Sequence, residues 1–338
     1  MVAILMVDKI MEKPYSFLKN KETNTGPITE CAITSLSHFG LIRISGSDKF
    51  DFLQGQLTND IKNVSLDQSQ LSSYCTHKGR ILASFRVFLR DDTLFFLLPL
   101  ELVEPTIKRL AMFVLRSDVK ITDCTSQFDL FEIAGDCIKD NLSANLPGSE
   151  NEVSRHDSYT IISLPGDRPR FLVITDNENH ETLLEKVKDL LIPTSMNSWA
   201  LLDIRAGIPN IYQENKEAFI PQMVNFQIID GVSFSKGCYT GQEVVARMHY
   251  LGKTKRRMFR ARTNVDETPK PGDNLFSEKG RSGQGAGKVI DASPSPDGGF
   301  EILIVAPVSN VKEKDIYLKK DFTDTLQILD LPYEVNDE

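Results

Sequence analysis

Residues 236–243 read Lys236-Gly237-Cys238-Tyr239-Thr240-Gly241-Gln242-Glu243, which places one thiol in a polar loop with two glycines. The residues before it, Asp230 to Ser235, predict a strand. The Thr-Gly-Gln-Glu end has the spacing of a capping box, so a helix is predicted to begin there. Cys238 is then expected just outside a helix N-terminus, where the helix dipole and the cation Lys236 favour thiolate over thiol. A reactive or metal-ligating cysteine fits these conditions, and so does a small cysteine that only packs in the interior.

A basic segment follows this helix. Cations are dense from Lys253 to Arg262, although the whole chain of 338 residues carries a net charge of −8. Direct contact with tRNA or another polyanion is one interpretation of the segment. The other is a solvated helix end and an exposed strand, because cations near a helix C-terminus complement its dipole. No RNA-binding motif accompanies the charges, so both interpretations stay open.

Length and composition predict a folded protein of two or three domains, because domains usually hold roughly 100 to 200 residues. Hydrophobic residues at 41% and charged residues at 25% are typical of globular chains. The acidic balance gives no global reason to bind an anionic membrane, and we recognise no signal peptide or membrane span. Five cysteines without a Cys-x-x-Cys spacing indicate no metal site and predict reduced thiols in a cytoplasmic protein.

Strand and helix patterns along the chain predict an α+β fold. The expected antiparallel strands include 71–75, 81–89 and 94–98, and the expected helices include 104–115. Gly79 is expected in a tight turn between two strands, and a short helix is expected between a Ser198 cap and Gly207. Beyond Met258, short strands separated by Pro and Gly turns predict a small antiparallel barrel or sandwich. Helices beside antiparallel meanders favour α+β over a doubly wound parallel sheet.

Several other kinds of site find no support. The five histidines form no His-Glu-x-x-His or Ser-His-Asp arrangement, which argues against a zinc or serine hydrolase. The glycine-rich stretch Gly280–Lys288 lacks Walker A spacing and is interpreted as a turn. Trp199, the only tryptophan, and Phe39 fit a core as well as an aromatic slot for a flat heterocycle.

The cysteine stretch, with Ile220–Asn225 before it and the residues to Arg247 after it, resembles the YgfZ family. That family is related to the aminomethyltransferase T-protein of glycine cleavage. The resemblance runs from about residue 30 to the C-terminus and also covers Ile44–Thr58, Lys78-Gly79 and Trp199–Pro209. It implies a three-lobed, T-protein-like ring with a ferredoxin-like lobe and a C-terminal small antiparallel β-barrel. The lobes are expected to surround a central tetrahydrofolate site.

These considerations divide the chain into four parts. The expected parts are a flexible N-terminal arm at 1–27, a central folate-binding region at 28–120 plus 196–252, a ferredoxin-like lobe at 121–195 and a C-terminal β-barrel at 253–338.

The resemblance also implies a function in iron–sulfur cluster assembly or repair and, through iron–sulfur enzymes, in tRNA modification. The expected partners are therefore folate and iron–sulfur proteins, including tRNA-thiolating enzymes. Aromatic residues at the positions of Phe39 and Trp199 are linked to folate in the family, where a Trp is frequent at the position of Phe39. Cys238 is the expected functional thiol, with Lys236 beside it. The remaining expected folate-binding residues are Arg205, Tyr239, Gln242 and Glu243.

Departures from the T-protein pattern argue against an active aminomethyltransferase. That enzyme carries an aspartate shortly after the hairpin glycine, where this chain reads Lys78-Gly79-Arg80-Ile81-Leu82-Ala83. Arg205 stands in the place of a T-protein glutamate. Since the carboxylate that assists carbon transfer is missing, we expect a tetrahydrofolate-binding accessory protein rather than a conventional enzyme. A folate-dependent aminomethyltransferase and a tRNA-binding module through Lys253–Arg262 are the alternative hypotheses.

Overall fold

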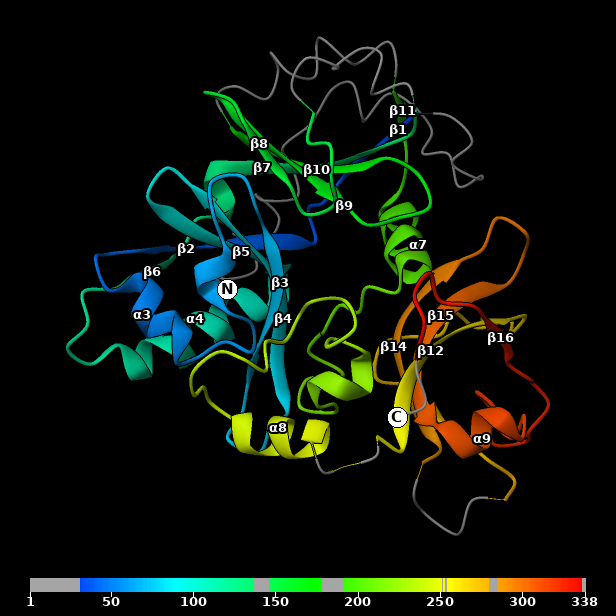
Figure 1. Ribbon diagram of the computed structural model, residues 1–338. Coiled ribbons are helices and arrows are strands. Elements are labelled where there is room, and N and C mark those ends of the chain that lie inside the picture. Colours follow the sequence, from blue (N-terminus) through cyan, green and yellow to red (C-terminus); the bar gives the residue numbers. More distant parts are fainter. Residues whose placement is uncertain are drawn as a thin grey trace, which may run out of the picture.

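The computed structural model describes residues 31–136, 146–177, 191–250, 252, 254–279 and 285–335. The expected N-terminal arm, residues 1–27, lies outside the described residues. The described part forms three sheets with helices beside and between them (Figure 1), which confirms the predicted mixture of helices and mainly antiparallel strands. No helix of this part is long and apolar enough to cross a bilayer.

The central sheet has the strand order β3-β4-β5-β2-β6. Its strands are β2 (Phe39–Ser45), β3 (Gln70–Cys75), β4 (Ile81–Arg90), β5 (Thr93–Pro99) and β6 (Lys120–Asp123). The helical segments near it are α3 (Lys49–Gln54), η1 (Ile61–Asn63), η2 (Leu100–Leu102), α4 (Val103–Val114) and η3 (Thr125–Gln127). Gly79 has a φ of 69° in the turn between β3 and β4, a conformation that glycine adopts without steric cost. The predicted meander and its turn are therefore confirmed.

A second sheet has the order β11-β1-β7-β10-β9-β8. Its strands are β1 (Ala32–Ser35), β7 (Phe128–Ala134), β8 (Val153–Arg155), β9 (Tyr159–Leu164), β10 (Arg170–Asp176) and β11 (Ile192–Pro193). All pairs are antiparallel except β1 with β11. Most of these strands come from the expected ferredoxin-like lobe, and β1 joins them from the beginning of the described chain. The ferredoxin-like character and the ring of three lobes stay predictions.

The third sheet is C-terminal, with the order β13-β14-β15-β12-β16. Its strands are β12 (Arg256–Thr263), β13 (Asn274–Leu275), β14 (Gly287–Pro294), β15 (Phe300–Pro307) and β16 (Gln327–Leu329), and α9 (Val308–Lys312) follows β15. All its pairs are antiparallel, as predicted. Within the described residues the end strands β13 and β16 do not pair with each other, so the expected closed barrel is not confirmed.

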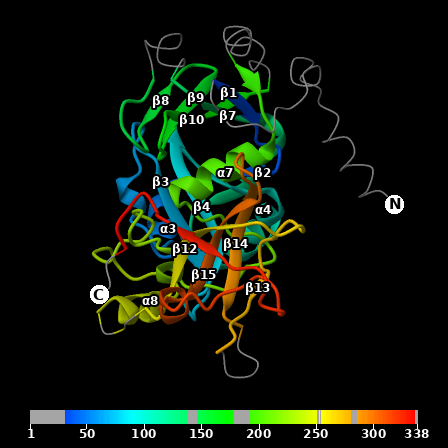
Figure 2. The same ribbon diagram turned by 90° about the vertical axis from the view of Figure 1, so that its right-hand side faces the viewer.

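Two helices and a turn of 3-10 helix connect the sheets, namely α7 (Met196–Ala206), η5 (Pro221–Val224) and α8 (Gln242–Tyr250). Figures 1 and 2 both show α7 between the second sheet and the C-terminal sheet, and α8 lies near the lower ends of β3 and β4. Ser195, not Ser198, is the N-cap residue of α7, so the predicted start was three residues late. Its end at Gly207, which has a left-handed φ of 67°, is confirmed.

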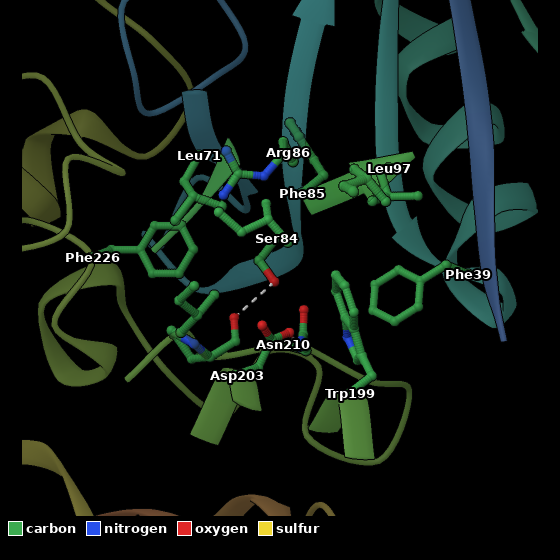
Figure 3. A pocket seen from close by; sticks show the side chains of 14 residues that line it. Phe39, Leu71, Ser84, Phe85, Arg86, Leu97, Trp199, Asp203, Asn210 and Phe226 are labelled. Atoms are coloured by element: carbon green, nitrogen blue, oxygen red, sulfur yellow. Dashed lines mark hydrogen bonds between the residues drawn. The ribbon is translucent and has the colours of Figure 1, made fainter. Parts of the chain in front are cut away.

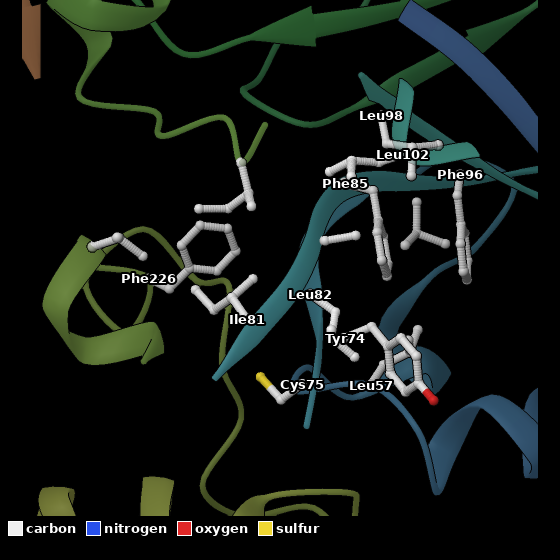
Figure 4. Close-up of a cluster of buried hydrophobic side chains, with 14 of the residues drawn as sticks. Leu57, Tyr74, Cys75, Ile81, Leu82, Phe85, Phe96, Leu98, Leu102 and Phe226 are labelled. Atoms are coloured by element: carbon white, nitrogen blue, oxygen red, sulfur yellow. The ribbon is translucent and has the colours of Figure 1, made fainter. Parts of the chain in front are cut away.

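The largest core cluster joins the central sheet to the C-terminal sheet. Figure 4 shows its centre, where Phe85 and Phe96 stack with ring centroids 4.3 Å apart and Phe226 packs on the opposite side of β4. Met258 and Val305 of the C-terminal sheet belong to the same cluster. Burial of this shared apolar surface therefore holds the two sheets together.

The cysteines of the described residues differ in whether they form a disulfide. Cys75, Cys124 and Cys238 are free, as predicted. Cys31 is disulfide-bonded, so the prediction of a reduced thiol is wrong there. Cys137 lies outside the described residues.

Candidate functional site

Phe39 and Trp199 meet although 160 positions separate them in the chain. Phe39 is the first residue of β2 and Trp199 lies in the first half of α7. Their rings form an edge-to-face pair with centroids 5.8 Å apart and an interplanar angle of 67°. The fold thus brings together the two aromatic residues that the sequence linked to folate (Figure 3).

A pocket with about 450 Å³ of empty space, part of it open to solvent, lies against these two rings. Its walls come from β2, β3, β4, β5, β9, β10, α7 and the segment 208–226. The lining residues are Phe39, Leu71, Ser84, Phe85, Arg86, Leu97, Leu164, Leu172, Trp199, Asp203, Ile208, Pro209, Asn210 and Phe226. Most of these side chains are apolar or aromatic, and a few polar groups converge among them. That composition is typical of a small-molecule site.

Asp203 is the acidic group of the pocket, one helical turn after Trp199 on the same face of α7. Its Oδ1 accepts a hydrogen bond from Arg170 Nη2 at 2.8 Å, and its Oδ2 accepts one from Asn210 Nδ2 at 3.0 Å. The Arg170 guanidinium carbon lies 5.3 Å from the centre of the Trp199 ring. Asp203 is therefore held in place by a cation that also packs against the aromatic wall.

Glu132 completes this buried group of charges. It accepts a hydrogen bond from Arg170 Nε at 2.6 Å, and both side chains are at most 2% exposed. Burial raises the pKa of Glu132 to about 7, against the opposing charge of Arg170. Burial lowers the pKa of Arg170, but the charges of Glu132 and Asp203 outweigh burial and raise it overall. The guanidinium is therefore permanently charged between two carboxyl groups.

Some buried polar atoms near the pocket have no partner within the described protein. They are Trp199 Nε1, Glu132 Oε2 and His38 Nδ1, the last on the residue before Phe39. Burial lowers the pKa of His38 to about 4, although Asp203 opposes this, so its ring is neutral at physiological pH. A buried polar atom without a partner costs roughly 1 to 3 kcal/mol. The unpaired indole N–H belongs to a residue that lines the apolar pocket, which makes it a candidate donor to a ligand.

The residues of the cysteine loop take a different arrangement from the predicted one. No strand forms from Asp230 to Ser235, which follow an irregular path. Lys236 is buried, and its Nζ donates hydrogen bonds to Leu57 O at 2.7 Å and Asn59 O at 2.9 Å. The ammonium also lies 5.2 Å from the centre of the Tyr239 ring. The lysine therefore anchors the loop to the segment after α3.

Burial lowers the pKa of Lys236 to about 8, and the nearby Asp60 carboxylate only partly offsets this. Cys238, two residues later, is exposed to solvent. The packing interpretation of this cysteine is therefore wrong, because its thiol is not a buried hydrophobic group. An exposed thiol is free to react with a small molecule or with another protein.

The predicted capping box does not form among the described residues. Helix α8 begins at Gln242, and the Thr240 hydroxyl donates a hydrogen bond of 3.5 Å to Gln56 Oε1. Gln242 is half-buried and Glu243 is exposed, with no side-chain hydrogen bond described for either. Gly241 has a φ of 85° and packs on the β3–β4 turn, so the helix start is set by contact with that turn.

The expected site residues therefore fall into separate groups. Phe39 and Trp199 line the pocket, whereas the cysteine loop lies at the start of α8, away from α7 (Figure 1). Arg205 belongs to neither group, because its guanidinium pairs with Glu301 at 2.7 Å. Sequence reasoning missed Asp203, although its position four residues after Trp199 on one helix was a usable signal.

Comparisons with known proteins show the family of the chain. Residues 13–154 match the family model described as the GCVT N-terminal domain. The tRNA-modifying protein YgfZ of Yersinia pseudotuberculosis is 33% identical over 311 residues, covering 90% of this chain and 93% of that protein. This chain belongs to the YgfZ family. The tRNA-modifying protein YgfZ of Yersinia enterocolitica is similar too, at 32% identity over 313 residues and with the same coverage of both chains.

A solved structure of another protein has a fold similar to that of this YgfZ chain. Aminomethyltransferase T of the glycine cleavage system from Bartonella henselae is similar with a TM-score of 0.70, over 90% of this chain and 86% of that one. The sequence identity is 15%, so the likeness concerns the fold alone. The resemblance to YgfZ proteins and their structural relation to the T-protein, both expected from sequence, are confirmed.

The basic segment of this YgfZ chain forms ion pairs within the protein at two of its arginines. Arg260 pairs with Glu301 at 2.6 Å, and Arg262 approaches Asp297 at 3.6 Å. Lys253 lies outside the described residues. Two of the charges that suggested a tRNA surface therefore pair with carboxylates within the protein.

No group of three or more His, Cys, Asp or Glu side chains in the described residues is arranged to hold a metal ion.

Proposed function

We propose that this YgfZ chain binds tetrahydrofolate in the pocket of Phe39 and Trp199. On this proposal it is an accessory protein that supports iron–sulfur cluster assembly or repair and thereby tRNA modification. The observation that carries the ligand assignment is the unpaired indole N–H of Trp199 in an apolar pocket that also presents Asp203. A pterin is a flat heterocycle with donors and acceptors along its edge. Apolar walls, one carboxylate and one free N–H suit such a ring.

The residues of the pocket have distinct roles in this proposal. Phe39 and Trp199 cover the faces or edges of the ring and exclude water from it. Asp203 accepts hydrogen bonds from the amino and ring N–H groups of the pterin. Arg170 and Asn210 keep the carboxylate of Asp203 oriented, because each donates to one of its oxygens. Tetrahydrofolate, when bound, supplies a carrier of one-carbon groups.

Cys238 is the working thiol of the proposed accessory function. It is exposed on a loop that Lys236 anchors, and it does not line the pocket. A thiol in that position acts on a partner protein rather than on the pterin. We therefore propose iron–sulfur proteins, including tRNA-thiolating enzymes, as the partners that Cys238 meets. The four residues after Gly79 include no carboxylate, so nothing here favours aminomethyl transfer.

Fluorescence of Trp199 tests folate binding directly, because this tryptophan is the only one in the chain. Tetrahydrofolate added under anaerobic conditions is expected to change the emission and to reach saturation. Calorimetry then compares Phe39→Leu with Phe113→Leu, a matched change at an exposed phenylalanine of α4. We expect binding to weaken roughly tenfold in the first variant, from lost aromatic contact, and to stay unchanged in the second. The absence of any saturable change in fluorescence or heat removes folate from the proposal.

A further inference from the structure

A second groove lies between the turn that follows β3 and the C-terminal sheet. It holds about 810 Å³ of empty space, part of it open to solvent. Three cationic side chains line it, Arg80 from the end of the turn, Arg256 from the start of β12 and Lys288 from the start of β14. The other lining residues are neutral, so this groove concentrates positive charge in a chain whose net charge is −8.

The register of the C-terminal sheet fixes how two of these cations are placed. Lys288 and Met258 both lie opposite Val305, on the two strands that flank β15. Residues directly opposite one another share a face, and so do residues two apart on one strand, which places Arg256 on the face of Met258. Arg256 and Lys288 therefore project from the same face on either side of β15. Two strand spacings separate their strands by roughly 10 Å.

Arg80 approaches from the central sheet, on the other side of the groove. Its Nη1 donates a hydrogen bond of 2.7 Å to Ala218 O, which fixes the guanidinium and leaves its other N–H groups available. Lys288 Nζ similarly donates to Gly272 O at 3.0 Å, and Arg256 Nη2 donates to Gly285 O at 3.3 Å. Each cation is thus oriented by one backbone carbonyl. Within the described residues none of the three forms an ion pair.

This arrangement contrasts with two other arginines of the same sheet. Arg260 and Arg262 also lie on β12, and each has a carboxylate partner. The three cations of the groove are half-buried and have no such partner within the described residues, so their charge is available to a bound anion. Charges brought together from two separate sheets and left without counter-charges have the properties of an anion site.

We propose that Arg80, Arg256 and Lys288 bind a small molecule that carries two or more closely spaced oxyanion groups. Two sources share this chemistry, namely a polyphosphate group and the γ-linked glutamate tail of a folate. The second source rests on the proposed function. It is the one favoured by position, because both the groove and the aromatic pocket are lined by residues of the segment 208–226. Arg80 of the groove also lies directly before β4, which lines the pocket. From Arg80 to Ser84, which lines the pocket, four residues of extended chain span roughly 13 Å.

Calorimetry with inorganic tripolyphosphate tests the anion site without any folate. We expect saturable binding that weakens with added salt. Arg256→Gln and Lys288→Gln are each expected to weaken it roughly tenfold, because each removes a charged donor. Arg262→Gln is the matched control on the same strand, where Asp297 already pairs with the cation, and it should leave binding unchanged. Melting temperatures of all variants confirm that they fold.

A second arm compares tetrahydrofolate carrying one glutamate with tetrahydrofolate carrying three. Tighter binding of the triglutamate form, lost in Lys288→Gln, identifies the tail as the ligand of the groove. Tripolyphosphate binding without any gain from the longer tail supports the site with a phosphate ligand instead. If tripolyphosphate binds but neither folate does, the proposed function fails and the anion site stands. If Arg256→Gln and Lys288→Gln weaken the binding of neither tripolyphosphate nor the triglutamate form, the inference is overturned.

Discussion

Arg170 Nη2 donates a hydrogen bond of 2.8 Å to Asp203 Oδ1, and both side chains are at most 4% exposed. The same guanidinium reaches Glu132 through Nε and lies over the ring of Trp199. One cation therefore connects β7, β10 and α7 around one side of the aromatic pocket. Because its charge balances two buried carboxyl groups, the geometry of the pocket depends on it.

Replacing Arg170 by Met is expected to destabilise the protein strongly. The change leaves Glu132 and Asp203 buried without a counter-charge, which costs about 3 to 5 kcal/mol of unfolding free energy. Urea unfolding followed by circular dichroism measures this. Arg155→Met is the control, because that guanidinium is 3.9 Å from an exposed Asp67 and such a pair contributes less than about 1 kcal/mol. Equal losses in the two variants would contradict the central role of Arg170.

The strands were predictable because hydrophobic periodicity is local, and the strands of the central and C-terminal sheets follow it closely. Contacts between distant segments were not predictable. The Thr240 hydroxyl bonds to Gln56, a residue 184 positions away, and so it does not cap α8. Likewise Ser233 N donates to Thr58 O, which holds the expected strand before Cys238 in an irregular path. Tertiary hydrogen bonds overrode the local pattern at both places.

In the candidate site, too, local sequence patterns were predictive and contacts between distant segments were not. Sequence resemblance named Phe39 and Trp199, but only the fold shows their rings at 5.8 Å. Arg205 and Asp203 lie on the same helix, and the packing of α7 decides which of them reaches the pocket. The helix points Asp203 toward the pocket and Arg205 toward Glu301. Periodicity alone does not tell which neighbouring element a given helix face will meet.

Asp291 gives the stability of the protein a dependence on pH. Its carboxyl is buried and accepts two hydrogen bonds. One comes from the Tyr212 hydroxyl at 3.0 Å and the other from the backbone N–H of Ala292 at 2.8 Å. Burial raises the pKa of Asp291 to about 7, from an ordinary value of 3.8, against the opposing effect of these hydrogen bonds. The folded state therefore holds the proton more tightly than the unfolded state. This stabilisation is complete at low pH and is lost as the pH rises through 7.

Asp291→Asn is expected to make the unfolding free energy less dependent on pH. Between about pH 5 and pH 8 the wild-type protein should lose roughly 2 kcal/mol more than the variant. Part of the dependence will remain, because burial raises the pKa of Glu132 to about 7 as well. Denaturant melts at several pH values measure the difference. Asp297→Asn, at a carboxylate 73% exposed, is the control and should follow the pH profile of the wild type. If the profile of Asp291→Asn also runs parallel to that of the wild type, the assignment to Asp291 is refuted.

Cys238→Ala separates function from packing. The thiol is exposed, so the unfolding free energy should change by less than about 0.5 kcal/mol. Growth of a bacterium that lacks its own YgfZ protein should nevertheless no longer be restored by the variant. Cys75→Ala is the converse control, because burial raises the pKa of that thiol to about 12 and keeps it an inert part of the core. We expect it to lose about 1 kcal/mol of stability and to retain function. Restored growth with Cys238→Ala would exclude the thiol from the function.

Two glycines of the same loop test how the cysteine segment is held. A Cβ at Gly241 would lie 2.4 Å from Thr76 O at a φ of 85°, whereas a Cβ at Gly237 meets nothing within 4 Å. Gly241→Ala must therefore either push α8 away from the β3–β4 turn or strain the backbone, at a cost of at least about 2 kcal/mol. Gly237→Ala should be neutral within about 0.5 kcal/mol.

The residues at which Gly241→Ala increases hydrogen exchange are as informative as the loss of unfolding free energy. If Gly241 holds the loop on the turn, hydrogen exchange in Gly241→Ala should rise first at residues 236–241 and at 76–80. Gly241 packs directly on Thr76 and Gly79, so loss of this contact would expose both segments to solvent. Exchange in Gly237→Ala should match the wild type at both places. A uniform rise across the central sheet in Gly241→Ala would show instead that the loop and the sheet unfold as one unit, with no separate docking of the cysteine segment.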